Sequence, residues 1–361
     1  MTIQKGKASG SEKSDAAPRQ RRRSGATTLR DVAVAVGVSL QTVSRALNNY
    51  GSISEELRDR IRLVADQMGY VTNRTARAMR TGRSQVIGFV VTDMRSPFFP
   101  ELAHAVERAA ATAGYVVLLV DAEGSTRDTV EVLKSQQVDG VIFTENSPTL
   151  ELLDRPVVVL SDSTRGRDTV SSNDVQGGGL LAEYLLSRGH ERIGMITSPL
   201  STCVPVRRGA FMNYPGCSET ICWEQYTGPD EIISDEILAR LKQLDVTALV
   251  CSHDVIAIRT LRALWELGIR CPQQMSVVGF DDIPWAALST PSLTTIRQPF
   301  EAMGSEAVRL LIDRINHPTR RMRHVKLDVA LVERESVQVM QSTSRLSRSA
   351  SGERLPHRTL A

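Results

Sequence analysis

The feature that most constrains this chain is a change in its hydrophobic period near Gln85. Beyond that point, short β-branched runs alternate with amphipathic segments, and the rhythm resumes after Asp174. Strands are predicted at 86–91, 116–121, 140–144, 157–160, 192–197, 247–252 and 275–281. Helices are predicted at 99–113, 126–137, 176–188, 206–212, 232–243 and 255–267. Such alternation predicts parallel sheets covered on both faces. The two runs predict two α/β subdomains, with crossovers between them at the long loops 148–156 and 289–299.

Residues 28–69 follow a different period, that of three short helices. Thr28 begins the first helix with a capping-box pattern, and Gly37 ends it because glycine adopts positive φ at low cost. Ser39 caps a second short helix, and a third begins near Ser54. The positions predicted to be buried are Leu29, Val32, Ala33, Val36, Val43, Ala46, Leu47, Leu57, Ile61, Val64, Ala65 and Met68. Two short helices joined by a glycine turn predict a helix-turn-helix, whose second helix enters the major groove of DNA.

The second helix of this pair carries polar side chains on the face away from its core. Gln41 can bind an adenine edge and Arg45 a guanine edge, each with two hydrogen bonds. Ser44 and Asn48 can reach phosphates or bases. An ordinary solvated helix face is the alternative, and the pattern alone does not separate the two.

Charge is distributed unevenly along the chain, whose net value is +3. The formal charge is +5 over residues 1–27, +4 over 28–83 and +3 over 341–361, which leaves −9 for 84–340. A basic first quarter before an acidic body favours a polyanionic partner for that quarter, although a solubilising tail would show the same charge. Residues 1–26 and 341–361 are predicted to be disordered basic tails.

Several classes of protein are disfavoured. No apolar run reaches the ~18–20 residues of a membrane span, and the basic N-terminus lacks the apolar stretch of a secretory signal. The five cysteines are irregularly spaced without a Cys-x-x-Cys pair, as expected of reduced thiols in the cytoplasm. No catalytic set, metal site or cofactor motif is identified, so we expect neither an enzyme nor a cofactor. Gly177–Gly179 is interpreted as close backbone packing rather than as a phosphate loop.

A dense set of short strings resembles the headpiece of the LacI/GalR family of bacterial repressors. They are Thr28-Leu29-Arg30-Asp31-Val32-Ala33, Ala35-Val36-Gly37-Val38-Ser39, Thr42-Val43-Ser44-Arg45-Ala46-Leu47-Asn48, Ile53-Ser54, Gly69-Tyr70 and Asn73-Arg74-Thr75-Ala76-Arg77-Ala78-Met79-Arg80. The resemblance implies a headpiece over 27–72, a hinge helix and linker over 73–83, and an effector-binding and dimerisation domain over 84–340. Met79 stands where the family usually has the leucine that wedges into the minor groove, and methionine is adaptable enough to serve there.

The resemblance also implies which residues contact DNA. They are Thr28, Leu29, Ser39, Leu40, Gln41, Thr42, Ser44, Arg45, Asn48, Asn73, Ala76 and Met79. Leu40 and Gln41, which open the recognition helix, carry much of the family's base choice. Leu40 can offer only an apolar contact, for instance to a thymine methyl group.

The body resembles the family's two-lobed, periplasmic-binding-protein-like domain. The resemblance rests on Thr92-Asp93-Met94-Arg95-Ser96-Pro97-Phe98-Phe99, Val277-Val278-Gly279-Phe280-Asp281-Asp282-Ile283-Pro284 and Pro291-Ser292-Leu293-Thr294-Thr295-Ile296-Arg297-Gln298-Pro299. It implies a sugar-like effector between the lobes, in contact with Phe98, Phe99, Arg207, His253 and Asp281. Asp162, which ends the predicted strand at 157–160, is a further candidate. Each has a plainer alternative, such as core packing for Phe99 or helix capping for Asp162.

The overall prediction is therefore an α/β protein with an all-α headpiece and two parallel sheets. We expect a cytoplasmic, nucleoid-associated homodimer that binds a near-palindromic operator and responds to a sugar or sugar derivative. One departure concerns 212–251, which is about a dozen residues shorter than expected for the family. The second lobe is thus predicted to lack part of a helix or strand, which makes a regulator without effector sensing the main alternative. A sugar-binding transport module and an enzyme are less favoured.

Overall fold

The computed structural model describes residues 27–47, 51–70, 78, 82–122, 126–145, 148–162, 166–197, 203–226 and 234–340. The chain divides into two compact units between Arg80 and Thr81. That division falls inside the segment predicted to be the hinge. Each unit is described separately below.

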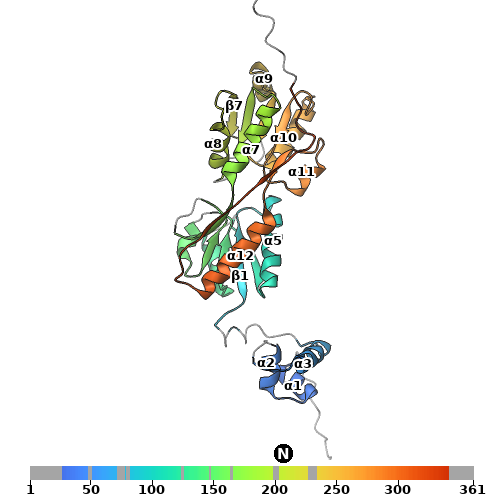
Figure 1. Ribbon diagram of the computed structural model, residues 1–361, viewed down its shortest axis with the longest axis vertical. Coiled ribbons are helices and arrows are strands. Elements are labelled where there is room, and N and C mark those ends of the chain that lie inside the picture. Colours follow the sequence, from blue (N-terminus) through green and yellow to red (C-terminus); the bar gives the residue numbers. More distant parts are fainter. Residues whose placement is uncertain are drawn as a thin grey trace, which may run out of the picture. The chain divides into compact units, whose positions relative to one another are not determined.

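The first unit is a bundle of three helices, α1 (Leu29–Val36), α2 (Leu40–Leu47) and α3 (Glu55–Gln67), labelled in Figure 1. The predicted caps are present: Thr28 and Asp31 form a capping box, and Gly37 has a φ of 78°. The core consists of seven buried side chains, namely Val32, Ala33, Val36, Val43, Ala46, Ile61 and Ala65. Leu29, Leu47, Leu57, Val64 and Met68 pack partly against them, so the helix-turn-helix prediction is confirmed.

The second unit has two lobes, and the first is built on a six-stranded parallel sheet in the order β11-β5-β4-β3-β1-β2. The strands are β1 (Val86–Val91), β2 (Val116–Asp121), β3 (Gly140–Phe143), β4 (Val157–Val159), β5 (Asp168–Ser172) and β11 (His324–Leu327). Alternate β1 side chains enter separate cores, because successive strand residues point to opposite faces. Helices α5 (Phe98–Thr112) and α12 (Phe300–Asn316) cover one face, and α6 (Thr126–Ser135) covers the other with the short helix Pro148–Leu152.

The second lobe has a four-stranded parallel sheet in the order β7-β6-β8-β9. Its strands are β6 (Ile193–Thr197), β7 (Ile221–Tyr226), β8 (Ala248–Cys251) and β9 (Ser276–Val278). Helices α7 (Asp174–Ser187) and α8 (Val204–Met212) pack on one face, and α9 (Asp235–Gln243) and α10 (Asp254–Glu266) pack on the other. A short helix, α11 (Pro284–Leu288), follows β9.

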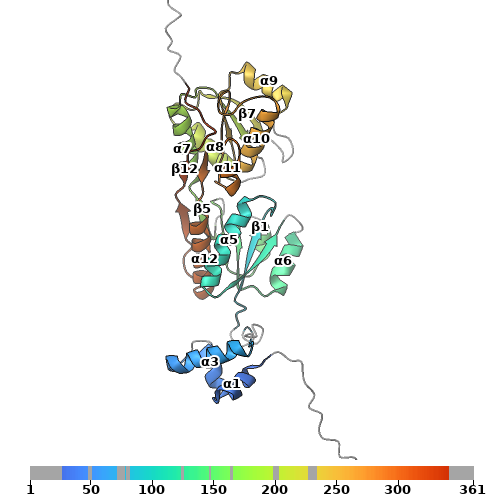
Figure 2. The same ribbon diagram turned by 90° about the vertical axis from the view of Figure 1, so that its right-hand side faces the viewer.

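Three segments connect the lobes (Figures 1 and 2). The chain leaves the first lobe between β5 and α7, returns between β10 (Thr295–Arg297) and α12, and leaves again between β11 and β12 (Ala330–Val332). Strands β10 and β12 pair antiparallel, which joins the second and third crossovers. The predicted crossover at 289–299 is confirmed. The one at 148–156 is wrong, because that segment connects β3 to β4 inside the same sheet.

The shortened region of the second lobe keeps its regular elements. Helix α8 ends at Met212 with Asn213 as its cap, and Pro215 and Gly216 follow, as the sequence predicted. Strand β7 and helix α9 are nevertheless both formed within 212–251. No whole strand or helix is therefore missing between β6 and β8, and among the described residues the early end of α8 is the one shortening that the sequence predicted and the structure shows.

Candidate nucleic-acid interface and interlobe site

Helix α2 presents a face that its own core does not use. Val43 and Ala46 are completely buried, whereas Gln41 and Arg45 are exposed and lie one helical turn apart on the same side. Leu40 is 49% exposed at the start of this face. An amide and a guanidinium so placed, beside an apolar side chain, can read base edges in a major groove.

The other predicted DNA contacts in the described headpiece lie near the starts of α1 and α2. The Ser39 hydroxyl accepts a hydrogen bond from the Thr42 N–H at 3.0 Å, which caps α2. The Thr28 hydroxyl donates to the Asp31 carboxylate at 2.6 Å, and these contacts lower the pKa of Asp31. Leu29 and Ser44 are half-buried. Asn48, Asn73, Ala76 and Met79 lie outside the described residues, and their roles stay predictions.

Arg207 organises the candidate effector site in the second lobe. Its side chain is buried, and its Nε donates to Asp174 Oδ1 at 2.9 Å while Nη1 donates to the Ser252 carbonyl at 3.0 Å. The guanidinium carbon lies 3.6 Å from the centre of the Phe280 ring, and Nη1 lies 3.6 Å from Asp281 Oδ1. Nearby carboxylates raise the pKa of Arg207 above its usual value even though burial opposes this. The guanidinium is therefore a fixed, charged donor.

Asp281, beside Arg207, and the neighbouring Asp254 have pKa values well above those of ordinary aspartates. Burial raises the pKa of Asp281 to about 8, against the opposing influence of Arg207. Burial also raises the pKa of Asp254 to about 6, although the Ile283 N–H and the Thr295 hydroxyl donate to it. Asp174 and Asp281 share the Arg207 guanidinium, and the nearby charge of Asp254 further raises the pKa of Asp281.

Close packing of α7 brings these groups together. A Cβ on Gly177 would lie 2.5 Å from the Phe280 ring, and one on Gly178 would lie 2.5 Å from the backbone oxygen of Arg207. Only glycine permits both approaches without a shift of the neighbours. The interpretation of Gly177–Gly179 as a packing element, rather than a phosphate loop, agrees with these contacts.

The site lies where parallel strands of the second lobe end. Ser252 follows β8, and Asp281 lies just beyond β9. Gln298, at the second crossover, donates to Asp281 Oδ1 at 2.6 Å. Ligands of open parallel sheets bind beyond the carboxyl ends of their strands, so both the placement and the polar groups suit a small molecule.

The remaining predicted effector residues are distributed more widely. His253 occupies the position before the first residue of α10, beside this cluster, and its side chain makes no capping hydrogen bond. Burial lowers its pKa to about 4, so it is neutral at physiological pH. Phe98 and Phe99 belong to the first lobe, where they contact each other edge-to-face at 5.2 Å and pack partly against its core. Asp162, also in the first lobe, forms a 2.7 Å ion pair with Lys326 Nζ.

Sequence reasoning missed three members of the cluster: Asp174, Phe280 and Gln298. Asp174 and Gln298 each sit at a crossover, next to the end of a strand. Asp174 follows β5, which is not among the predicted strands, so a search of predicted strand ends does not find it. The role of Gln298 needs the three-dimensional path of the crossover.

Open space beside Arg207 is small in this structure. A cavity of about 20 Å³ is lined by Arg207, Phe211, Phe280 and neighbouring side chains. A drug-sized ligand needs several hundred Å³. A broader groove of about 670 Å³ lies between α5 and α12, away from the Arg207 cluster. Entry of a sugar next to Arg207 therefore requires a local rearrangement.

Comparison with known proteins connects both sites to one family. Residues 28–73 match Bacterial regulatory proteins, lacI family, and residues 182–337 match a periplasmic binding protein-like domain. The ribose operon repressor of Escherichia coli strain K12 is 30% identical over 331 residues, which cover 86% of this chain and 99% of that repressor. This chain belongs to the lacI family. It is thus a DNA-binding transcriptional regulator with an effector-binding domain, as predicted, rather than an enzyme.

Solved structures of similar proteins support the same fold for this lacI-family chain. A LacI family transcriptional regulator from Enterococcus faecium, solved with bound ribose, has a TM-score of 0.64 and 27% identity, and the match covers 71% of this chain and all of that one. The lac repressor dimer bound to operator has a TM-score of 0.73, and the match covers 87% of this chain and all of the lac repressor chain. At 24% identity, the latter likeness shows the fold alone. Within the described part of the chain, no helix is both long and apolar enough to cross a membrane.

Proposed function

We propose that this protein is a repressor that binds a near-palindromic operator as a homodimer and responds to a sugar or sugar derivative bound beside Arg207. The observation that carries the proposal is the pairing of an exposed Gln41–Arg45 face with a buried arginine and carboxylate cluster at the lobe crossovers. The first supplies base recognition, and the second supplies bidentate partners for vicinal hydroxyl groups. The similar E. coli protein is a ribose operon repressor, and D-ribose is accordingly the first effector to test.

The proposed homodimer follows from the symmetry of a near-palindromic operator, which needs two headpieces in a two-fold arrangement. The second lobe offers apolar surface for such a contact. On α11, Trp285 is 53% exposed and Leu288 is 78% exposed. Two large apolar side chains exposed on one short helix form an apolar patch of the kind that protein–protein contacts use.

The proposed mechanism couples effector binding to the angle between the lobes. An effector that binds across Asp281 and the crossovers would change that angle and with it the arrangement of the hinges, which follow Tyr70 in the chain. A differential affinity of a few kcal/mol between the two arrangements suffices to fill or empty an operator. Because the operator lies on the chromosome, we place the protein in the cytoplasm, associated with the nucleoid.

A regulator that no longer senses an effector is the second candidate, favoured by the small cavity beside Arg207. Thermal-shift measurements on the full chain with D-ribose, other sugars, sugar phosphates and nucleosides separate the two. Effector sensing predicts a concentration-dependent rise in melting temperature for one class, which Asp281→Asn abolishes. No rise with any class would support the second candidate. In either case, deletion of residues 1–83 should abolish sequence-specific DNA binding in a gel-shift assay.

A further inference from the structure

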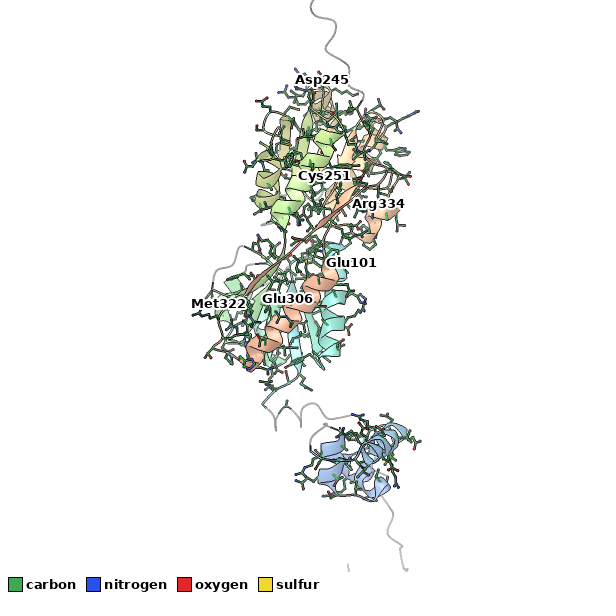
Figure 3. The ribbon with its side chains drawn as sticks, viewed as in Figure 1. Glu101, Asp245, Cys251, Glu306, Met322 and Arg334 are labelled. Carbon is green, nitrogen blue, oxygen red and sulfur yellow. The ribbon has the colours of Figure 1, made fainter. Side chains whose placement is uncertain are left out.

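Asp282, the residue after Asp281, has a different set of hydrogen-bond partners from Asp281. Asp282 is 6% exposed at its side chain, and it accepts hydrogen bonds from Arg297 Nε and Arg334 Nη2, both at 2.6 Å. Arg297 ends β10 on the second crossover, and Arg334 lies just after β12 on the third. Figure 3 labels Arg334 on the second-lobe side of these crossovers. One carboxylate therefore connects the second and third crossovers.

Arg334 is itself held firmly. Its Nη1 donates to the Leu293 carbonyl at 2.7 Å, and its backbone N–H donates to the Thr294 hydroxyl at 2.9 Å. Its side chain is 16% exposed, whereas that of Arg297 is 59% exposed. The carboxylate of Asp282 is thus fixed from the β12 side by a partly buried, pre-organised arginine, Arg334, and from the β10 side by the more exposed Arg297.

The backbone at Asp281 and Asp282 is unusual. Their φ angles are 125° and 58°, in the region that side chains other than glycine seldom adopt. The Asp281 N–H donates to the Ile296 carbonyl at 2.8 Å, and the Gln298 N–H donates to the Asp281 carbonyl at 3.2 Å. Such a conformation persists only where the surroundings over-determine it, and the contacts of Asp282 provide that restraint.

We propose that Asp282, held between Arg297 and Arg334, is the positioning residue that fixes Asp281 for the effector and ties the effector site to the crossovers. Asp282 faces its two arginines and Asp281 faces Arg207 and Gln298, so the two neighbours contact different partners through one strained backbone. A shift of Asp281 on effector binding then moves Asp282, and through it both crossovers. This inference rests on the proposed function for the effector and goes beyond it in assigning the coupling.

The variant that tests the proposal is Asp282→Asn, which keeps the volume and removes the charge. The matched control is Glu224→Gln. Glu224 lies on β7 and also accepts two short bonds from one arginine, Arg208 at 2.6 and 2.7 Å, but it does not touch a crossover. Both variants remove one largely buried carboxylate from a strong ion pair in the same lobe. Only Asp282 should affect Asp281.

The first measurement needs no effector. Hydrogen–deuterium exchange on the full chain should be at least about tenfold faster in Asp282→Asn for peptides that contain the Asp281 and Gln298 amides. The reason is that their hydrogen bonds, to the Ile296 and Asp281 carbonyls, lose the restraint. Glu224→Gln should match the wild type at these peptides. Unchanged exchange in Asp282→Asn, or equal acceleration in both variants, would overturn the proposal.

The second measurement uses calorimetric titration of D-ribose. The affinity for D-ribose should fall at least about tenfold in Asp282→Asn, while it stays within about twofold of the wild type in Glu224→Gln. An unchanged D-ribose affinity would contradict the positioning role. If the wild type does not bind D-ribose, the effector assignment fails, and the exchange experiment still decides the role of Asp282.

A gentler variant guards against misfolding. Arg297→Gln removes only the more exposed of the two contacts and should accelerate exchange in the same peptides by a smaller factor. Combining it with Asp282→Asn should add little to the effect of Asp282→Asn alone, because the two residues act through one interaction. Additive acceleration would show that they act independently and would overturn the assignment.

Discussion

Replacing Arg207 with methionine should destabilise the second lobe through the carboxylates that it leaves behind. Methionine keeps an apolar stem against the Phe280 ring but cannot donate to Asp174 or to the Ser252 carbonyl. Removing one partner of a buried ion pair costs about 3–5 kcal/mol, because the other charge remains buried without compensation. We expect a loss of that size in the free energy of unfolding at pH 8.

The loss should shrink as the pH falls. Without Arg207, carboxylate charge stays buried with no counter-charge, so the folded variant favours binding a proton that the unfolded chain releases. A carboxyl whose pKa is higher in the folded than in the unfolded chain contributes its full stability below the unfolded-state pKa. This contribution is lost as the pH rises through the folded-state pKa. The free energy of unfolding of the variant should therefore approach that of the wild type as the pH falls from 8 to 5. For each extra proton bound, the gap should narrow by about 1.4 kcal/mol per pH unit.

Urea denaturation of the full chain, followed by tryptophan fluorescence, measures this pH-dependent loss of stability. The signal reports on the second lobe, because that lobe contains Trp223, Trp265 and Trp285. Asp174→Asn combined with Arg207→Met should recover part of the stability at pH 8. Arg240→Met, at an exposed arginine, is the control and should change the unfolding free energy by less than about 0.5 kcal/mol. A loss below about 1 kcal/mol, or one that is the same at both pH values, would refute the reasoning.

Three further predictions concern the DNA-binding face, the effector site and the dimer. Gln41→Ala and Arg45→Ala should each weaken operator binding by about 1–3 kcal/mol, roughly 5- to 150-fold, and relax the preference at one base. Competition binding between operator variants measures both effects. Equal weakening on all sequences would contradict base readout. The wild-type Asp281 carboxyl has a pKa of about 8 in the folded state, so the wild type loses stability as the pH rises from 5 to 9. Asp281→Asn does not titrate there, so its free energy of unfolding should rise relative to that of the wild type over this range. Parallel curves of unfolding free energy against pH would contradict this prediction. Leu288→Asp should raise the dimer dissociation constant at least about tenfold in analytical ultracentrifugation, whereas Val175→Asp, at a similarly exposed valine on α7, should not.

The parts of the fold that sequence could predict are those set by local periodicity. The caps at Thr28 and Gly37 and the alternation along β1 depend on neighbours a few residues away. Strand β5 was missed because its residues, Asp168–Ser172, are mostly polar, and they are buried only because the sheet continues on both sides. Helix α12 has a clear apolar period, but its packing on the first lobe depends on the crossover after β10.

The candidate site was predictable in the same limited way. Asp281 and Arg207 could be chosen from sequence because they lie next to recognisable strings. Asp174 could not be chosen as their partner, since the pairing needs the close approach of α7 and α8 at Gly178. The role of Asp282 depends on Arg334, 52 residues away in the chain.

The central claim is that the headpiece directs an effector-responsive dimer to one near-palindromic DNA sequence. Selection of bound duplexes from a random library by the full-length protein tests it most directly, with selections run without sugar and with D-ribose. The account predicts enrichment of two inverted half-sites one helical turn or a multiple apart, a change in recovery with the effector, and loss of enrichment in the Gln41→Ala, Arg45→Ala double variant. Recovery of duplexes without a common sequence, or enrichment that survives this double variant, would contradict it.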